Sequence, residues 1–313
     1  MSKRFFWIFF LFGCIDPYEG ILYHYPKGCK LKIITTITIL YDFVREVGAN
    51  RICVESLVPV GGDPHTYEPI PSDIIRISKA DVIIANGHHL ENWLFKLISN
   101  KRENAIYFEV AKDIEPYNND PHLWMDVILA MEYVKKIRDF LISIDPDGKE
   151  IYNKNYEKYM KKLKKLDEFI RCVVSKIPSE DRKLITTHDA YSYFSRRYGF
   201  EFIGSIWGIS TEDEPSAKEI KKLVDLIRQK KAKAVFVETT VNPRIMESIA
   251  KETKIRVGKK LYGDSVGKQG SNAETYIKMQ IHNIKAIYEG LTGKNYNGEC
   301  DEELKDIEFN SVL

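Results

Sequence analysis

The 313-residue sequence has little of what is typical of a membrane-spanning or nucleic-acid-binding protein. Its N-terminal apolar run, Phe5–Phe12, is far shorter than the roughly 20 residues that a helix needs to cross a bilayer. The 47 basic residues are nearly balanced by 45 acidic ones, which argues against a nucleic-acid partner held on a basic surface. Five cysteines without Cys-x-x-Cys spacing are too few for a disulfide scaffold, and no glycine-rich phosphate loop occurs.

What is present is typical of a soluble globular chain. Hydrophobic residues make up 44% and charged residues 29%. The length suggests about two domains.

The N-terminus has the pattern of an export signal. Lys3 and Arg4 precede the short apolar run, and the residues up to Cys14, Leu-Phe-Gly-Cys, resemble a lipobox, where a signal is cut before a lipid-modified cysteine. We predict an export signal over 1–13, a lipid on Cys14, a tether over 14–30, and a location on the extracellular or periplasmic face of the cell membrane. The alternatives are a wrongly assigned start codon and a buried apolar N-terminus. Cleavage would remove two basic residues and leave the chain formally neutral.

From residue 31 onward, short β-branched runs alternate with longer amphipathic stretches. This alternation predicts an α/β fold with two lobes, each with a mostly parallel sheet and flanking helices. The N-terminal lobe, 31–146, should hold strands near 31–38, 52–58, 81–85 and 105–110 and a helix near 125–141. The C-terminal lobe, 183–291, should hold strands near 183–187, 200–206, 234–238 and 254–258 and a helix near 272–289. The tail, 292–313, remains unassigned.

A long helix is predicted between the lobes. The segment 151–177 contains no glycine or proline, and its apolar residues recur every three or four positions. At 1.5 Å per residue it would be roughly 40 Å long, enough to run along both lobes. We expect a rigid bridging helix within 147–178; the alternative is the seam of a coiled-coil dimer.

Four polar sites follow predicted strands. His65 and His122 each end an Asp-Pro-His tripeptide, His188 ends the strand at 183–187, and Asp264 follows the strand at 254–258. Because ligands of open α/β sheets bind beyond the carboxyl ends of the strands, these four residues are expected to converge on the interlobe cleft. Three imidazoles and one carboxylate form a suitable tetrahedral shell for a divalent metal. The alternative is that Asp-Pro forms a turn and the histidine after it is an ordinary surface residue.

Nearby residues have weaker claims to a role. The aspartates beside the histidines, at 63, 120 and 189, either orient the rings or cap turns. Glu238 is either an acid behind the site or a helix cap. His88 and His89 are expected in a solvated loop, and Trp93, Trp124 and Trp207 are expected to pack in the interior.

Several longer motifs carry a family resemblance. These are GGDPHTYEPIPSD (61–73), ADVIIANGHHLENWL (80–94), DPHLWMD (120–126), THDAYSYFSRRYGF (187–200), STEDEPSAKEIKKLVDLI (210–227), FVETTVNPR (236–244) and LYGDSVG (261–267). Together they resemble the TroA-like, or cluster 9, metal-binding lipoproteins of zinc and manganese ABC transporters. The resemblance implies two α/β lobes bridged by a rigid helix and one metal ion in the cleft, held by His65, His122, His188 and Asp264. It also implies a monomeric, lipid-anchored binding protein, not an enzyme, that delivers its ion to an ABC permease and its ATPase.

The ligand set favours zinc as the transported ion, with manganese or iron possible. Manganese-preferring relatives often carry glutamate where this chain has His188, and imidazole suits zinc better than manganese. The short segment 111–119 lacks the histidine-rich loop of many zinc-specialised relatives, which weakens exclusive zinc specificity. Two alternatives are a metal-dependent hydrolase, whose metal keeps a position open for water, and an iron-chelate or corrinoid binding protein.

Overall fold

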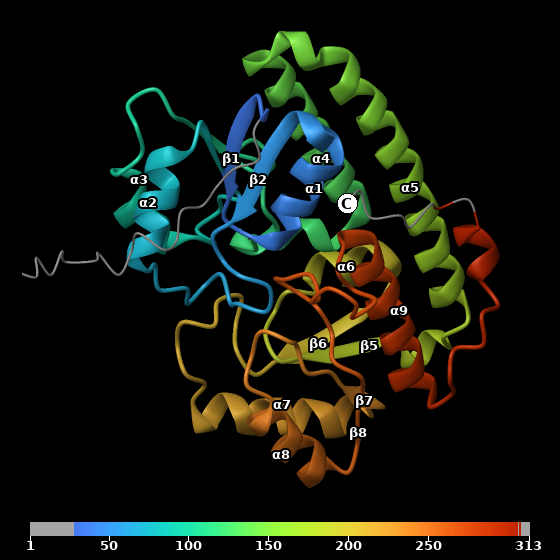
Figure 1. Cartoon of the computed structure of the whole chain (residues 1–313). Helices are drawn as coiled ribbons and strands as arrows, with labels where there is room; N and C mark the ends of the chain where they lie inside the picture. Colours follow the sequence, from blue (N-terminus) through green and yellow to red (C-terminus); the bar gives the residue numbers. More distant parts are fainter. Residues whose placement is uncertain (1–27, 306, 308–313) are drawn as a thin grey trace, which may run out of the picture.

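A computed structural model of the chain describes residues 28–305 and 307. The predicted export signal, Cys14 and most of the tether lie outside these residues. The two-lobed α/β fold is confirmed, with one lobe above the other in Figure 1 and the long helix α5 along one side. None of the helices in the described ranges combines the length and hydropathy that crossing a bilayer requires.

The N-lobe is a four-stranded parallel sheet covered by helices. The strands pair in the order β2-β1-β3-β4. The lobe contains β1 (Leu31–Thr35), α1 (Thr38–Gly48), β2 (Ile52–Ser56), α2 (Pro71–Lys79), β3 (Val82–Ala85), α3 (Phe95–Ile98), β4 (Ile106–Glu109) and α4 (Val127–Ile144). All four predicted strands are present, but the first ends early, because α1 begins at Thr38.

The C-lobe has shorter parallel strands. It contains β5 (Lys183–Thr186), α6 (Ser192–Tyr198), β6 (Glu201–Ser205), α7 (Ala217–Lys230), β7 (Ala234–Val235), α8 (Arg244–Thr253), β8 (Arg256–Val257) and α9 (Tyr276–Thr292). The strands predicted at 234–238 and 254–258 shrink to two residues each. Pairing breaks at Lys259 and Lys260 and resumes as an isolated bridge between Glu238 and Leu261. The backbone N–H of Phe236 donates to Ile185 at 2.9 Å, which places β7 beside β5.

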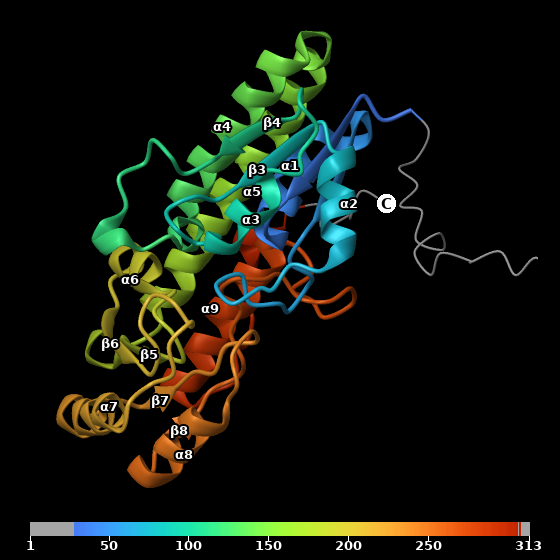
Figure 2. The ribbon, with the colours of Figure 1, turned by 90° about the vertical axis from the view of Figure 1, so that its left-hand side faces the viewer.

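The helix α5 (Lys149–Ser175) bridges the two lobes. It begins after the 3₁₀ turn Pro146–Gly148 and packs against α1 and α4 of the N-lobe and against α9 of the C-lobe, so that it lies behind both lobes in Figure 2. Its apolar stripe, including Leu163, Leu166 and Ile170, is buried. The 27-residue length matches the prediction, with the start displaced by two residues.

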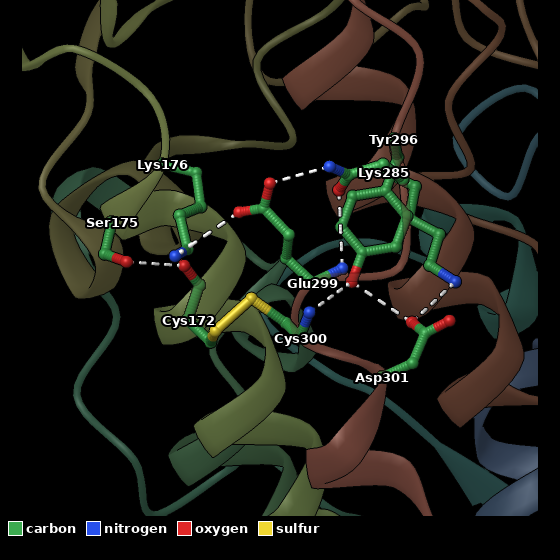
Figure 3. The surroundings of a disulfide bond; sticks show 9 residues. Cys172, Ser175, Lys176, Lys285, Tyr296, Glu299, Cys300 and Asp301 are labelled. Carbon is green, nitrogen blue, oxygen red and sulfur yellow. Dashed lines mark hydrogen bonds and ion pairs between the residues drawn. A yellow bond between two sulfur atoms is a disulfide. The ribbon is translucent and has the colours of Figure 1, made fainter.

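The segment after α9 folds back onto α5. A short 3₁₀ helix, Asp301–Leu304, follows Cys300, which forms a disulfide with Cys172 on α5 (Figure 3). Lys176 pairs with Glu299 at 3.4 Å beside it. A second disulfide joins Cys29 and Cys53 within the N-lobe. The sequence did not assign these pairings, and the described part of the tail belongs to the packed structure.

Glu91 ties together the ends of two strands in the N-lobe. Its buried carboxylate accepts the Thr36 hydroxyl at 2.6 Å and the backbone N–H groups of Asn86 and Gly87 at 2.8 and 3.1 Å. Burial raises the pKa of Glu91 to about 7, although these hydrogen bonds oppose the rise. Its pKa in the folded protein therefore lies above its unfolded value, so the charged form costs stability at high pH.

We expect this cost to be removed on acidification. The parent should gain roughly 2 kcal/mol in its free energy of unfolding, relative to Glu91→Gln, between pH 8 and pH 5.5. Denaturant unfolding of both proteins with chelator present measures the difference at each pH. A difference that does not change with pH would contradict the assignment.

Candidate metal centre

All four predicted ligands lie at the carboxyl ends of parallel strands. His65 is in the loop after β2, His122 follows β4, His188 follows β5, and Asp264 follows β8. Each lobe thus supplies two of them. The structure brings all four together: one ligand atom from each lies within 4.8 Å of the others, and all four residues are buried.

The two Asp-Pro-His tripeptides form the same kind of turn. Asp63 Oδ1 accepts the backbone N–H of His65 at 2.9 Å, and Asp120 Oδ1 accepts that of His122 at 2.9 Å. A hydrogen bond from a carboxylate to the amide two residues on is characteristic of an Asx turn, and the intervening proline restricts it further. The repeated motif therefore presents each imidazole from a rigid loop.

The ring nitrogens and the carboxylate face a common centre. His65 Nε2 lies 3.1 Å from His122 Nε2, and Asp264 places its oxygens 3.3 Å from His122 Nε2 and 3.1 Å from His188 Nε2. The longest of these separations, between His65 Nε2 and Asp264 Oδ2, is 4.0 Å. Ligands about 2.0–2.1 Å from a tetrahedral ion stand about 3.3 Å apart, so the spacing suits zinc with only small adjustments.

Carboxylates stand behind two of the rings. Asp120 Oδ1 lies 2.7 Å from His122 Nδ1, and Glu238 Oε2 lies 2.9 Å from His188 Nδ1. An ionised carboxylate only accepts hydrogen bonds, so these contacts favour the proton on Nδ1 and direct Nε2 toward the centre. Of the aspartates beside the histidines, only Asp120 contacts a ring: Asp63 accepts an amide, and Asp189 accepts the Ser192 hydroxyl.

Burial lowers the pKa of a histidine, whereas nearby carboxylates raise it, and the balance differs among the three ligands. Burial lowers the pKa of His65 to about 3, despite the Asp264 charge. Burial also opposes a charge on His122, but two nearby carboxylates outweigh it and raise its pKa to about 9. Glu238 and Asp264 likewise outweigh burial and raise the pKa of His188. A cation entering the site therefore displaces protons from these two rings.

Several polar atoms of the site have no hydrogen-bond partner. Those that face the common centre are both oxygens of Asp264 and Nε2 of His188. They lie close to one another, but without hydrogen-bond geometry. Because a buried polar atom without a partner is costly, this concentration of unpartnered atoms indicates a place for a cation.

Gly263 lets Asp264 approach this centre. A Cβ on Gly263 would lie 2.6 Å from Glu238 Oε2 and 3.6 Å from His188 Cε1. A larger residue would therefore push the carboxylate behind His188 out of place.

The sequence did not reveal how side chains fix the ligand loops. Trp93 Nε1 donates to the carbonyl of Pro64 at 2.7 Å, Asn86 Nδ2 to that of Pro121 at 3.1 Å, and Trp124 Nε1 to that of Gly263 at 2.9 Å. Each of these carbonyls immediately precedes a predicted ligand. The tryptophans are buried, as expected, but two of them also position the site.

The remaining histidine candidates stay outside the cluster. His88 is half-buried, and its Nε2 lies 2.9 Å from the carbonyl oxygen of Ile114, whereas His89 is exposed.

Glu238→Gln tests the carboxylate behind His188. The amide would place an N–H₂ group toward His188 Nδ1 or toward the donors that Glu238 Oε1 now accepts, the Thr187 hydroxyl and the His188 amide. We expect a loss of metal affinity of about 10–100-fold. Asp189→Asn, beside the same histidine but off its ring, is the matched control for a calorimetric titration and should bind as the parent does. Equal affinities of parent and Glu238→Gln would show that Glu238 has no such role.

Comparison with known proteins places this chain in a family. The family described as zinc-uptake complex component A, periplasmic, matches residues 33–290. The chain belongs to this family. Its members are substrate-binding proteins of metal ABC transporters rather than enzymes, which disfavours the hydrolase alternative.

Individual relatives are similar over most of their length. The manganese-binding lipoprotein MntA of Halalkalibacterium halodurans is 40% identical over 271 residues, covering 85% of this chain and 90% of the relative. The manganese ABC transporter substrate-binding lipoprotein PsaA of Streptococcus anginosus is 37% identical over 281 residues, covering 85% and 91%. Among solved structures, the periplasmic zinc binding protein TroA from Treponema pallidum superposes with a TM-score of 0.78 at 31% identity, covering 84% of this chain and 99% of TroA.

Proposed function

We propose that this protein captures one divalent metal ion outside the cytoplasm and delivers it to the permease of an ABC importer. His65, His122, His188 and Asp264 hold the ion. The observation that carries this proposal is the buried cluster of three imidazoles and a carboxylate at the lobe interface, in which polar atoms lack hydrogen-bond partners. Four protein ligands close the coordination shell, which suits binding and release rather than hydrolysis by a metal-bound water.

The proposal includes how the protein is held at the membrane. The signal over 1–13 directs export, and a lipid on Cys14 anchors the protein, as the names of the lipoprotein relatives support. The remaining chain acts as a monomer, and its partners are the permease and the ATPase of the importer.

We propose zinc as the ion bound most tightly, with manganese or iron also accepted. Imidazole nitrogens suit zinc, and the order of affinities among divalent metals favours zinc over manganese at almost any such site. The names of the relatives support either ion, because TroA is named for zinc and MntA for manganese.

Competition titration of the purified chain tests the choice of metal. We expect one ion per chain, with Zn²⁺ displacing bound Mn²⁺ when the two are present at equal concentrations, because three nitrogen ligands favour zinc. Removal of the metal with a chelator should lower the melting temperature, since an ion that binds only the folded state stabilises it. Preferential retention of Mn²⁺ would contradict the zinc assignment, and no binding of Zn²⁺, Mn²⁺ or Fe²⁺ would contradict the whole proposal.

A further inference from the structure

The carboxylate of Asp63, in the N-lobe, accepts one hydrogen bond from its own lobe and one from the C-lobe. Its Oδ1 accepts the backbone N–H of His65 at 2.9 Å, within the turn that presents this ligand. Its Oδ2 accepts the hydroxyl of Thr211 at 2.6 Å, 148 residues further along the chain and in the C-lobe. One side chain therefore joins the loop of the first imidazole to a loop of the opposite lobe.

The loop that carries Thr211 begins beside His188, the histidine ligand that follows β5. This β6–α7 loop, residues 206–216, begins where the backbone N–H groups of Ile206 and Trp207 donate to the carbonyl of Thr187 at 3.1 and 3.0 Å. The N–H of Asp189 donates to Gly208 at 3.0 Å. Thr187 and Asp189 flank His188, so the loop runs from one ligand of the C-lobe to the turn of a ligand in the N-lobe.

Thr211 differs from its neighbours in this loop. Ser210 and residues 212–214 are exposed, whereas Thr211 is half-buried. Its hydroxyl donates to a carboxylate, and hydrogen bonds to charged acceptors are among the stronger ones. Thr211 is therefore the one residue of the stretch 210–214 that packs toward the site.

Other hydrogen bonds also cross between the lobes near the ligands. The Tyr193 hydroxyl donates to the carbonyl of Asp120 at 3.1 Å, and several others end beside Asp264. Ser265 Oγ accepts the backbone N–H of Gly61 at 2.8 Å, and the carbonyl of Gly263 accepts Trp124 Nε1 at 2.9 Å. The Thr211–Asp63 bond differs in that it ends on the side chain that holds the turn of His65.

We propose that Thr211 is a positioning residue that latches the two lobes across the bound ion and slows its release. This inference rests on the proposed function. Each lobe carries two of the four ligands, so the ion leaves when the lobes separate, and separation breaks the bond between Thr211 and Asp63. The latch forms after the ion has entered, so it acts on the release rate more than on the association rate.

Zinc release from the full chain tests the latch. Zinc-loaded protein is mixed with an excess of a colorimetric chelator in a stopped-flow instrument, and the parent is compared with Thr211→Val, which removes the hydroxyl, and Thr211→Ser, which keeps it. We expect release from Thr211→Val to be about tenfold faster. Thr211→Ser and the exposed-loop control Ser210→Ala should release within about twofold of the parent. The association rate and the melting temperature of the metal-free protein should not change.

Equal release rates for Thr211→Val and the parent would overturn the latch. So would fast release from Thr211→Ser, or a fall in the metal-free melting temperature of Thr211→Val, which would show a merely structural role. A parent chain that binds neither Zn²⁺ nor Mn²⁺ would contradict the proposed function instead, and this result is separate because it needs no variant.

Discussion

Replacing His122 with alanine is expected to lower the affinity for Zn²⁺ by about a thousandfold while the metal-free protein still folds. His122 Nε2 lies 3.1 Å from His65 Nε2 and 3.3 Å from Asp264 Oδ1, so its loss leaves an incomplete coordination shell. The turn itself should persist, because Asp120 Oδ1 accepts the backbone N–H of residue 122, which alanine retains. Calorimetric titration measures the affinity, and thermal unfolding with and without zinc measures the coupled stability.

The matched control is His282→Ala. The Nε2 atom of His282 lies 2.9 Å from the carbonyl oxygen of Lys260, and His282 is not part of the ligand cluster, so this variant should bind zinc as the parent does. At a zinc concentration 100 times Kd, the parent and the control should gain about 2.7 kcal/mol of stability, whereas His122→Ala should gain almost none at that concentration. A His122→Ala protein that binds zinc as tightly as the parent would show that the ion lies elsewhere.

Removing the disulfide between Cys172 and Cys300 should cause the largest loss of stability among the variants considered. The two cysteines are 128 residues apart in sequence, and the chain-entropy model assigns a closed loop of this size roughly 5 kcal/mol. The bond also fixes the segment after α9 against the bridging helix (Figure 3). The double variant Cys172→Ser with Cys300→Ser should therefore unfold at a clearly lower denaturant concentration than the parent.

The other disulfide offers the comparison. Cys29 and Cys53 are 24 residues apart, for which the same model gives roughly 3.5 kcal/mol, so serine at both positions should cost less. Denaturant unfolding of the two double variants without metal measures both losses. Equal losses, or no loss from the Cys172 and Cys300 pair, would contradict the ranking by loop size.

Local sequence patterns predicted much of the fold and the members of the candidate site. Alternating strand and helix patterns placed the ligand candidates at the carboxyl ends of strands, where parallel sheets bring them together. The uninterrupted helical stripe predicted the bridging helix within two residues at each end. Both depend on short-range periodicity, which a single sequence carries well.

Contacts between segments far apart in the sequence were harder to predict. The role of Glu238 depends on β7 lying beside β5, a pairing that no local pattern specifies, and the contact of Thr211 with Asp63 spans 148 residues. The four cysteines after Cys14 allow three connectivities, among which spacing alone does not choose. The C-lobe strands predicted at 234–238 and 254–258 are only two residues long each, and the β-branched pattern does not mark where their pairing stops.

Anomalous diffraction at the zinc edge, from crystals of the zinc-loaded protein, tests the metal site most directly. We expect one strong peak between the lobes, about 2.0–2.2 Å from Nε2 of His65, His122 and His188 and from an oxygen of Asp264. A peak away from these four side chains would contradict the proposed site. An ion that retains water in place of one of the four ligands would contradict the closed coordination on which the proposed capture and release depends.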